Sequence, residues 1–234
     1  MSITKNYYIF LFISSLVAVV AVLGFSAPSS VKLNIQSSFN TKILSKNQWY
    51  ISALNDSILF NKVQFYLTDF RLKTKEGNIY KLKDSNYLVD LFKPETLTIP
   101  LRIPKLRVGT ELSVTIGVPS SLHTAGALSG DLDPSKGMYW SWQSGFINFK
   151  IEGVSPRCKT RKNKFQFHIG GYKKPYNTEK RLSFTLDGDT LNLDLKLESF
   201  FDSVPLSITN QVMVPGQKAN ELAIAFSKTF TSIE

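Results

Sequence analysis

Short runs in which apolar and polar residues alternate fill most of this chain, and they constrain its fold more than any other feature. A period of two is typical of a β-strand that buries one face. The clearest runs begin at Val31, Val63, Leu97, Leu112, Phe165, Leu182 and Leu191. Many short strands at this spacing predict an all-β protein, a mostly antiparallel β-sandwich of jelly-roll or Ig-like type.

One of these runs shows how the faces are assigned. In KVQFYLTDF, alternation puts Val63, Phe65 and Leu67 on one face. The same pattern puts Tyr66 and Phe70 on the opposite face. An uninterrupted strand of this kind would bury two different sets of side chains on its two sides.

Three local signals refine this picture. Pro100 predicts an edge strand in its run, because proline cannot donate to a strand ladder. The sequence Asp187-Gly188-Asp189 predicts a hairpin turn between two strands. Apolar residues four apart between Lys218 and Phe230 predict one short C-terminal helix that packs on the sandwich.

The N-terminus indicates export. Lys5 is the only charge before an apolar run at residues 7–25, and small residues follow it. We expect residues 1–27 to be a secretory signal peptide, with an uncleaved anchor as the alternative because the run is long. We expect residues 28–234 to form one exported domain, in contact with the membrane only through an uncleaved N-terminus.

Composition limits the remaining classes of protein. The single cysteine, Cys158, cannot form an intramolecular disulfide, and it lies in the basic stretch SPRCKTRKNK. This stretch leaves two interpretations, a thiol activated by nearby cations or an exposed loop cysteine without a role. The formal net charge of +10 favours anionic surfaces, but no basic helix or RNA-binding signature is present, so nucleic acid is not expected as a partner.

The stretch GMYWSWQSGFINFKIEG concentrates aromatic residues. Trp140 and Trp142 lie two residues apart, beside Tyr139. If one strand ran through the whole stretch, both indoles would share the solvent-side face with Asn148, whereas a bulge at Gly145 would return them to the interior. The residues therefore offer either an aromatic platform or a packing device under the loop at residues 120–136.

The second half of this stretch, FINFKIE, predicts a strand. Ile147, Phe149 and Ile151 alternate with polar residues, so we expect these three side chains on one buried face.

Catalytic and metal motifs are scarce. The chain has two histidines, His123 in a loop and His168 in FHIGG, and no nucleophile elbow, H-E-x-x-H, C-x-x-C or P-loop. Asp131 and Asp133 lack the run of oxygen ligands that calcium takes, so a turn is the better interpretation. We therefore expect a protein that is not an enzyme, and we keep a hydrolase built on His168 as a minor alternative.

GDLDPSKGMYWSWQSGFINFKIEG, followed by FQFHIGGY, resembles the MbnP-like family of copper-associated periplasmic proteins. The segments NDSILFNKVQFYLTDFRL, NYLVDLFKPETLTIPL and VMVPGQKANELAIAFSKTF resemble further blocks of that family. The resemblance implies an exported β-sandwich in the periplasm or on the cell surface of a Gram-negative bacterium. In some members, histidines and a tryptophan oxidised to kynurenine bind one copper ion, and a di-haem, cytochrome c peroxidase-like partner of the MauG type performs the oxidation.

Carried over, the resemblance makes His168 the family histidine and Trp140 and Trp142 its W-S-W pair. Copper-binding relatives have another histidine in or just after the first strand, where this chain reads NIQSSFN. His123 would then have to serve as the second metal ligand. The sequence thus suggests a copper-associated binding protein, with a carbohydrate- or protein-binding module that uses Tyr139, Trp140 and Trp142 without metal as the alternative.

Overall fold

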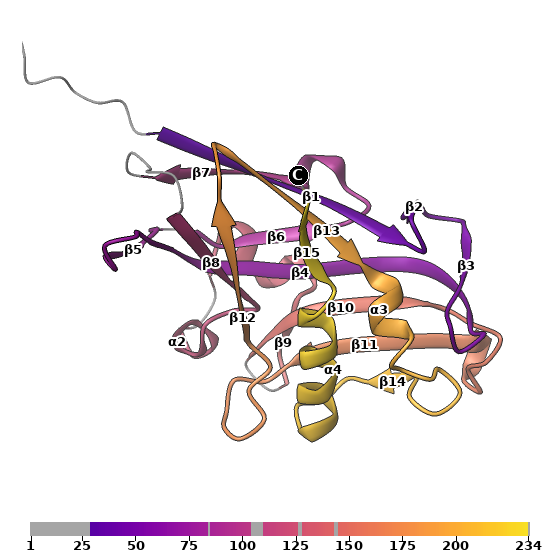
Figure 1. Ribbon diagram of the computed structural model, residues 1–234. Coiled ribbons are helices and arrows are strands. Elements are labelled where there is room, and N and C mark those ends of the chain that lie inside the picture. Colours follow the sequence, from indigo (N-terminus) through magenta and orange to yellow (C-terminus); the bar gives the residue numbers. More distant parts are fainter. Residues whose placement is uncertain (1–28, 84, 104–109, 126–127, 143–144, 234) are drawn as a thin grey trace, which may run out of the picture.

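Two β-sheets face each other across an apolar interior (Figure 1). The computed structural model describes residues 29–83, 85–103, 110–125, 128–142 and 145–233. The predicted signal peptide, residues 1–27, lies outside the described residues. The predicted β-sandwich with a short C-terminal helix is confirmed.

The smaller sheet has the order β15-β13-β1-β2, and β7 also pairs with β1. Its strands are β1 (Ser29–Phe39), β2 (Lys42–Ile43), β7 (Thr98–Ile103), β13 (Thr190–Lys196) and β15 (Phe230–Ile233). β1 and β13 run parallel, with Leu33 opposite Leu191. β7 pairs with no described strand other than β1, so the edge position predicted from Pro100 is confirmed.

The larger sheet has the order β12-β8-β4-β10-β11-β14, with four short strands added to β4 and β10. Its main strands are β4 (Ser57–Lys73), β8 (Thr110–Ile116), β10 (Gly145–Val154), β11 (Lys164–Gly170), β12 (Lys180–Leu186) and β14 (Gln211–Val212). The short ones are β3 (Trp49–Ile51), β5 (Ile79–Lys81), β6 (Tyr87–Asp90) and β9 (Tyr139–Trp140). β4 is the organising strand, because five others, β10 among them, pair with it along its length.

Helices are short and lie in the connections. They are α2 (Ser120–His123), α3 (Leu197–Phe201) and α4 (Gln217–Ser227), with 3-10 turns η1 (Pro94–Thr96), η2 (Gly130–Leu132), η3 (Pro134–Lys136) and η4 (Arg161–Asn163). Within the described parts of the chain, no helix is long and apolar enough to cross a membrane. The predicted C-terminal helix is α4, but Phe230 belongs to β15 and not to the helix.

Phenylalanines dominate the main core between the sheets. Phe226 of α4 stacks on Phe149 of β10, with ring centroids 4.2 Å apart. Phe226 also meets Phe65 of β4 and Phe230 of β15 edge-on, so α4 joins both sheets. Such offset and edge-to-face packing adds to the stabilisation that burial of these rings provides.

A second apolar cluster, here called the outer cluster, covers the opposite side of the larger sheet. It consists of Tyr66, Leu88, Val118, Leu132, Met138, Trp140, Phe146 and Ile147. The segment from Val118 to Trp140 supplies half of these residues, so this connection packs over the sheet. The sequence-based expectation of a structureless loop at 120–136 is therefore corrected, since α2, η2 and η3 lie within it.

Two bulges change the predicted faces. The ladder between β4 and β8 shifts between Thr68 and Arg71, where Asp69 has a φ of 48°. Phe70 therefore returns to the main core, and its predicted place beside Tyr66 is wrong.

The second bulge lies in β10. The ladder to β11 shifts between Ile147 and Phe149, and not at Gly145 as one sequence-based reading required. Ile147 joins the outer cluster, whereas Phe149 and Ile151 enter the main core. The prediction that these three side chains share one face is therefore wrong, because one extra residue reverses the alternation.

Two further expectations are corrected. Asp187-Gly188-Asp189 is not a hairpin turn, because it links β12 in the larger sheet to β13 in the smaller sheet. Cys158 is neither exposed nor activated. It is buried, and burial raises the pKa of its thiol to about 11 despite the basic neighbours in the sequence.

Candidate functional site

The pairing of β10 with β11 decides which side chains share the outer face of the larger sheet. Lys150 lies opposite His168, and Glu152 lies opposite Gln166. Paired residues of a ladder project to the same side, while Phe167 points into the main core. The outer face therefore carries a row of polar side chains on two neighbouring strands.

His168 and Glu152 form a hydrogen-bonded pair on this face. The imidazole Nε2 lies 2.6 Å from Oε1 of Glu152, and the side chains are 12% and 25% exposed. The hydrogen bond from His168 is the main cause that keeps the pKa of Glu152 below its usual value, against the opposing effect of burial. The carboxylate thereby fixes the orientation of the ring.

Lys150 links this face to the tryptophan stretch. Its Nζ donates a hydrogen bond to the carbonyl oxygen of Gly137, and its side chain is buried. Burial lowers the pKa of Lys150, although Glu152 nearby favours the charged form. The contact attaches the start of the segment at residues 137–142 to the sheet.

The two tryptophans have different environments. Trp140 is 7% exposed and lies in the outer cluster, whereas Trp142 is 63% exposed. Their ring centroids are 5.6 Å apart with an interplanar angle of 44°. Tyr139 is half-buried and packs edge-on against Phe146 at 5.1 Å. The packing interpretation therefore describes Trp140, and only Trp142 presents an open ring.

Trp140 lies on the same side of β11 as His168. A Cβ atom built on Gly170 would come within 2.8 Å of Cζ3 of Trp140, so the indole covers that glycine directly. Residues 168 and 170 project to the same face of a strand. The structure thus brings the indole of Trp140 and the imidazole of His168 to one face.

His123 occupies a different kind of position. Its Nδ1 accepts a hydrogen bond from the backbone N–H of Phe146 at 3.0 Å, and its Nε2 donates to the carbonyl of Val118 at 2.9 Å. The ring is buried and stacks on Tyr172 at 4.5 Å, and burial lowers its pKa. Both nitrogens are engaged in the fold, so this imidazole has no free donor for a metal.

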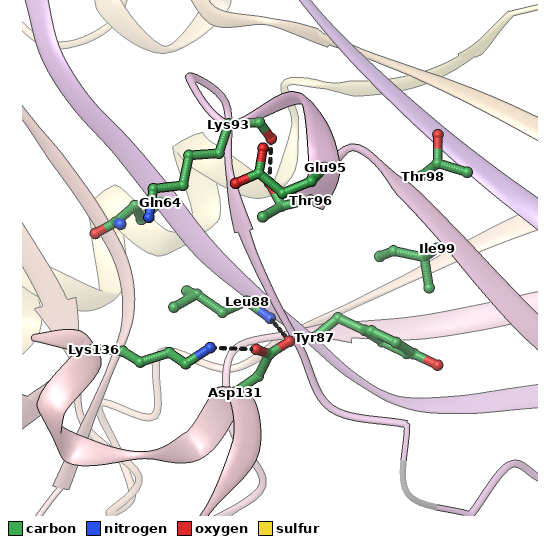
Figure 2. Close-up of a pocket in the computed structure, with 10 residues that line it drawn as sticks. All are labelled: Gln64, Tyr87, Leu88, Lys93, Glu95, Thr96, Thr98, Ile99, Asp131 and Lys136. Atoms are coloured by element: carbon green, nitrogen blue, oxygen red, sulfur yellow. Dashed lines mark hydrogen bonds and ion pairs between the residues drawn. The ribbon is translucent and has the colours of Figure 1, made fainter.

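Asp133 stabilises a turn, as predicted, whereas Asp131 bonds to strand β6 and to Lys136. Asp131 accepts hydrogen bonds from the backbone N–H of Leu88 at 3.0 Å and from Nζ of Lys136 at 2.8 Å (Figure 2). Asp133 accepts from the N–H of Ser135 at the start of η3.

A pocket of about 400 Å³ lies beside Asp131. It is lined by charged, hydroxyl and apolar side chains, which Figure 2 shows as sticks.

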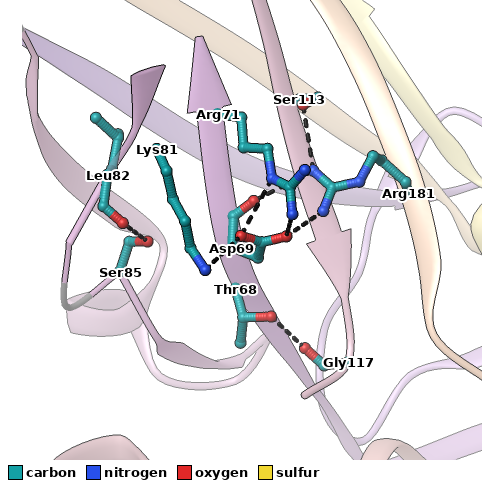
Figure 3. A network of polar contacts seen from close by, with 9 residues as sticks. All are labelled: Thr68, Asp69, Arg71, Lys81, Leu82, Ser85, Ser113, Gly117 and Arg181. Atoms are coloured by element: carbon teal, nitrogen blue, oxygen red, sulfur yellow. Dashed lines mark hydrogen bonds and ion pairs between the residues drawn. The ribbon is translucent and has the colours of Figure 1, made fainter. Parts of the chain in front are cut away.

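Sequence reasoning missed two groups. Glu152 was assigned only to a polar face, and its partnership with His168 depends on strand register. Asp69 was missed entirely, although an acidic residue inside the apolar run FYLTDF was a signal. Its buried carboxylate binds Arg71 at 2.7 Å, Lys81 at 3.3 Å and the guanidinium of Arg181, and so ties three strands together (Figure 3).

The donor atoms suit copper only in part. Among the described residues, no three of His, Cys, Asp and Glu are grouped closely enough to hold a metal ion. His168 and Glu152 offer one imidazole and one carboxylate. Copper in proteins favours several nitrogen or sulfur ligands, so these side chains do not fit a tight site.

The fold and this face define a class of protein, a two-sheet β protein that carries a tryptophan pair and an imidazole–carboxylate pair outside its larger sheet. The model of one family, MbnP, matches residues 28–217. The chain therefore belongs to the MbnP family. This membership suggests a copper-associated, MbnP-like protein.

Two further comparisons were made. The solved structure titled "MbnP from Methylosinus trichosporium" is similar in fold, with a TM-score of 0.61 at 17% sequence identity. The similarity covers 76% of this chain and 79% of that chain. Comparison with curated proteins gives no match.

Proposed function

We propose that the protein is an exported, non-enzymatic, copper-associated binding protein whose working surface contains His168, Glu152, Trp140 and Trp142. The observation that carries the proposal is the position of the Trp140 indole over Gly170, on the same side of β11 as His168. Trp142 extends this surface into solvent, 5.6 Å from Trp140 between ring centroids. Membership in the MbnP family supports the association with copper.

We assign contact with copper to His168 and Glu152 and not to His123. His168 shares its face with a carboxylate, whereas both nitrogens of His123 are bonded to the backbone. A site with one imidazole and one carboxylate would bind weakly, because copper affinity rises with the number of nitrogen ligands. Copper would therefore be held only weakly, by the His168 ring together with the Glu152 carboxylate.

Copper titration of the purified protein tests this assignment. We expect weak binding of one ion that His168→Ala abolishes and Glu152→Gln weakens. Gln166→Ala is the matched control, since Gln166 is a polar neighbour on the same face. Equal binding by the wild type and His168→Ala, or no binding at all, would contradict the copper assignment.

The proposed partner is a di-haem, MauG-type oxidase that acts on a tryptophan and yields kynurenine. Trp142 is the ring that such a partner can reach, and Trp140 lies directly behind it. Co-expression followed by intact-mass measurement and peptide mapping tests this part. We expect modification within residues 139–142 and none in a Trp142→Phe/Trp140→Phe variant; unmodified tryptophans would count against the oxidase.

A binding module without metal is the second candidate, and the open ring of Trp142 is the observation that favours it. Aromatic rings at exposed positions commonly contact carbohydrate or protein partners. In this case a ligand would quench tryptophan fluorescence in the presence of a chelator. Trp142→Ala would abolish that response, and His168→Ala would leave it unchanged.

A further inference from the structure

Four large apolar side chains are exposed together at one end of the sandwich, and we name them the apolar tip. Ile43 is 75% exposed, Trp49 51%, Ile51 59% and Leu54 41%. Hydrogen bonds hold their segments side by side. Nδ2 of Asn40 donates to the carbonyl of Ile51 at 2.9 Å, and the hydroxyl of Tyr50 donates to the carbonyl of Ile43 at 3.2 Å. The apolar tip is therefore an ordered surface.

A basic loop lies beside the apolar tip. The connection from β10 to β11 exposes five cations, which are Arg157, Lys159, Arg161, Lys162 and Lys164. Nε of Arg157 lies 3.6 Å from Oδ1 of Asp56, at the base of the β3–β4 turn that carries Leu54. Figure 1 shows β2, β3 and the β10–β11 turn at the same end of the molecule.

The basic loop has a fixed shape. Cys158 is buried beneath it, with Sγ 3.8 Å from the carbonyl of Leu206. The N–H of Ser155 donates to the carbonyl of Asn163 at 2.9 Å, which closes the loop. Lys42 and Lys46, which flank Ile43 in the sequence, add two exposed cations, and residues 40–55 and 155–164 contain no acidic residue.

We propose that this end of the molecule docks on an anionic phospholipid surface. The apolar tip would enter the headgroup region, where tryptophan and aliphatic side chains are stabilised, while the surrounding lysines and arginines meet lipid phosphates. Each such cation contributes about 1 kcal/mol near an anionic membrane. Asp202, which accepts a hydrogen bond from the N–H of Ala53, and Asp56, which lies beside Arg157, are the acidic residues in contact with this end, and seven cations outnumber them. This excess of positive charge around protruding apolar side chains favours an anionic lipid surface over a second copy of the chain, whose equally charged tip would repel it.

The apolar tip and the basic loop share no residue with the copper-associated site or with the N-terminal run. Trp140 pairs with Gly145 at the first residue of β10, whereas the basic loop follows Val154 at its last residue. Ser29 begins β1, and the apolar tip lies beyond its other end, Phe39 (Figure 1). The proposal therefore stands whether or not the proposed function does.

Amide hydrogen exchange of the full chain with lipid vesicles tests the proposal. Because residues 7–25 could attach the chain to any bilayer, the measurement must be local to residues 42–54 and 157–164. We expect protection there with phosphatidylglycerol-containing vesicles, little with pure phosphatidylcholine, and loss of protection at high salt. Lys159→Glu/Arg161→Glu should raise the vesicle concentration for half-maximal protection by roughly 30-fold or more.

Trp49→Ser/Ile51→Ser should also abolish local protection, and Trp142→Ser is the matched control because it removes an exposed tryptophan elsewhere. All of these side chains are exposed, so unchanged unfolding curves will show that the variants fold. Protection that is equal on both vesicles, or that survives both double variants, would overturn the proposal. Self-association that Trp49→Ser/Ile51→Ser abolishes, without vesicle protection, would assign the tip to a second copy and overturn it too.

Discussion

Gly170 shows how one missing side chain shapes the candidate site. Its Cα faces the Trp140 ring so closely that any Cβ would lie 2.8 Å from Cζ3. We predict that Gly170→Ala lowers the free energy of unfolding by about 1–3 kcal/mol, because the new Cβ collides with the backbone carbonyl oxygen of Phe146 and with the packed indole, so both must move. Urea denaturation monitored by tryptophan fluorescence measures the change.

Gly188→Ala is the control for this substitution, since a Cβ at Gly188 meets nothing within 4 Å. We expect that variant to unfold at the wild-type urea concentration. If both variants unfold alike, Trp140 is not packed on β11, and the shared face of Trp140 and His168 loses its support.

Individual faces were predicted well where strands are regular and poorly where they are bulged. Alternation placed Val31, Leu33 and Ile35 in the interior, and they lie there. Alternation misplaced Phe70 and Ile147, because each follows or adjoins a bulge, where one extra residue exchanges the two faces of the strand. The sequence pattern does not reveal where such a bulge lies. The contact between His168 and Glu152 was equally hidden, since it requires the register of two strands.

The connection from β8 to β9 is the element that depends most on polar contacts. His123 bonds to the backbone of Val118 and Phe146, and the side chain of Asn148 accepts from the N–H of Val118 at 3.0 Å. Together they pin this connection to β10. The outer cluster, and with it the position of Trp140, rests on these bonds.

We predict that His123→Ala destabilises the fold by about 2–4 kcal/mol, since it leaves the Phe146 N–H buried without a partner. Acrylamide quenching of tryptophan fluorescence should increase as Trp140 becomes accessible. Thr124→Ala is the control, because Thr124 is exposed on the same segment. Unchanged stability and quenching would contradict this role of His123.

The same residue gives a pH dependence. Burial lowers the pKa of His123, so it is neutral in the fold and binds a proton more readily in the unfolded chain. The stability it provides is therefore complete above about pH 6.5 and decreases as the pH falls below that value. Urea unfolding at a series of pH values should show this decrease in the wild type, and a smaller one in His123→Ala.

The sequence predicted most elements but not how they are arranged. Strands and the C-terminal helix follow from local periodicity, which a single run of residues contains. The parallel pairing of β1 with β13 joins segments from opposite ends of the chain, and the crossing from β12 to β13 changes sheets. The parallel pairing and the crossing both depend on which apolar faces meet in the complete fold. A local turn sequence such as Asp-Gly-Asp does not contain that information.

The closure of the sandwich is completed by the last part of the chain. The match to the MbnP family ends at Gln217, the first residue of α4, yet the side chains of α4 enter the main core and β15 pairs with β13 in the smaller sheet. Phe226 contacts Phe149 and Phe65 of the larger sheet and Phe230 of the smaller one. The fold of the matched region therefore depends on residues beyond it.

We predict that Phe226→Ala lowers the free energy of unfolding by about 3–5 kcal/mol, because it opens a cavity where both sheets and α4 meet. Ile224→Ala, two residues away on the same helix, removes a side chain that is 41% exposed and should cost less than about 1 kcal/mol. Urea unfolding of the two variants gives the comparison. Since Phe226 packs on both sheets, a loss of unfolding cooperativity in Phe226→Ala alone would indicate that the two sheets separate without α4. Equal effects of the two substitutions on the free energy of unfolding would mean that α4 does not hold the sheets together, which would contradict the prediction.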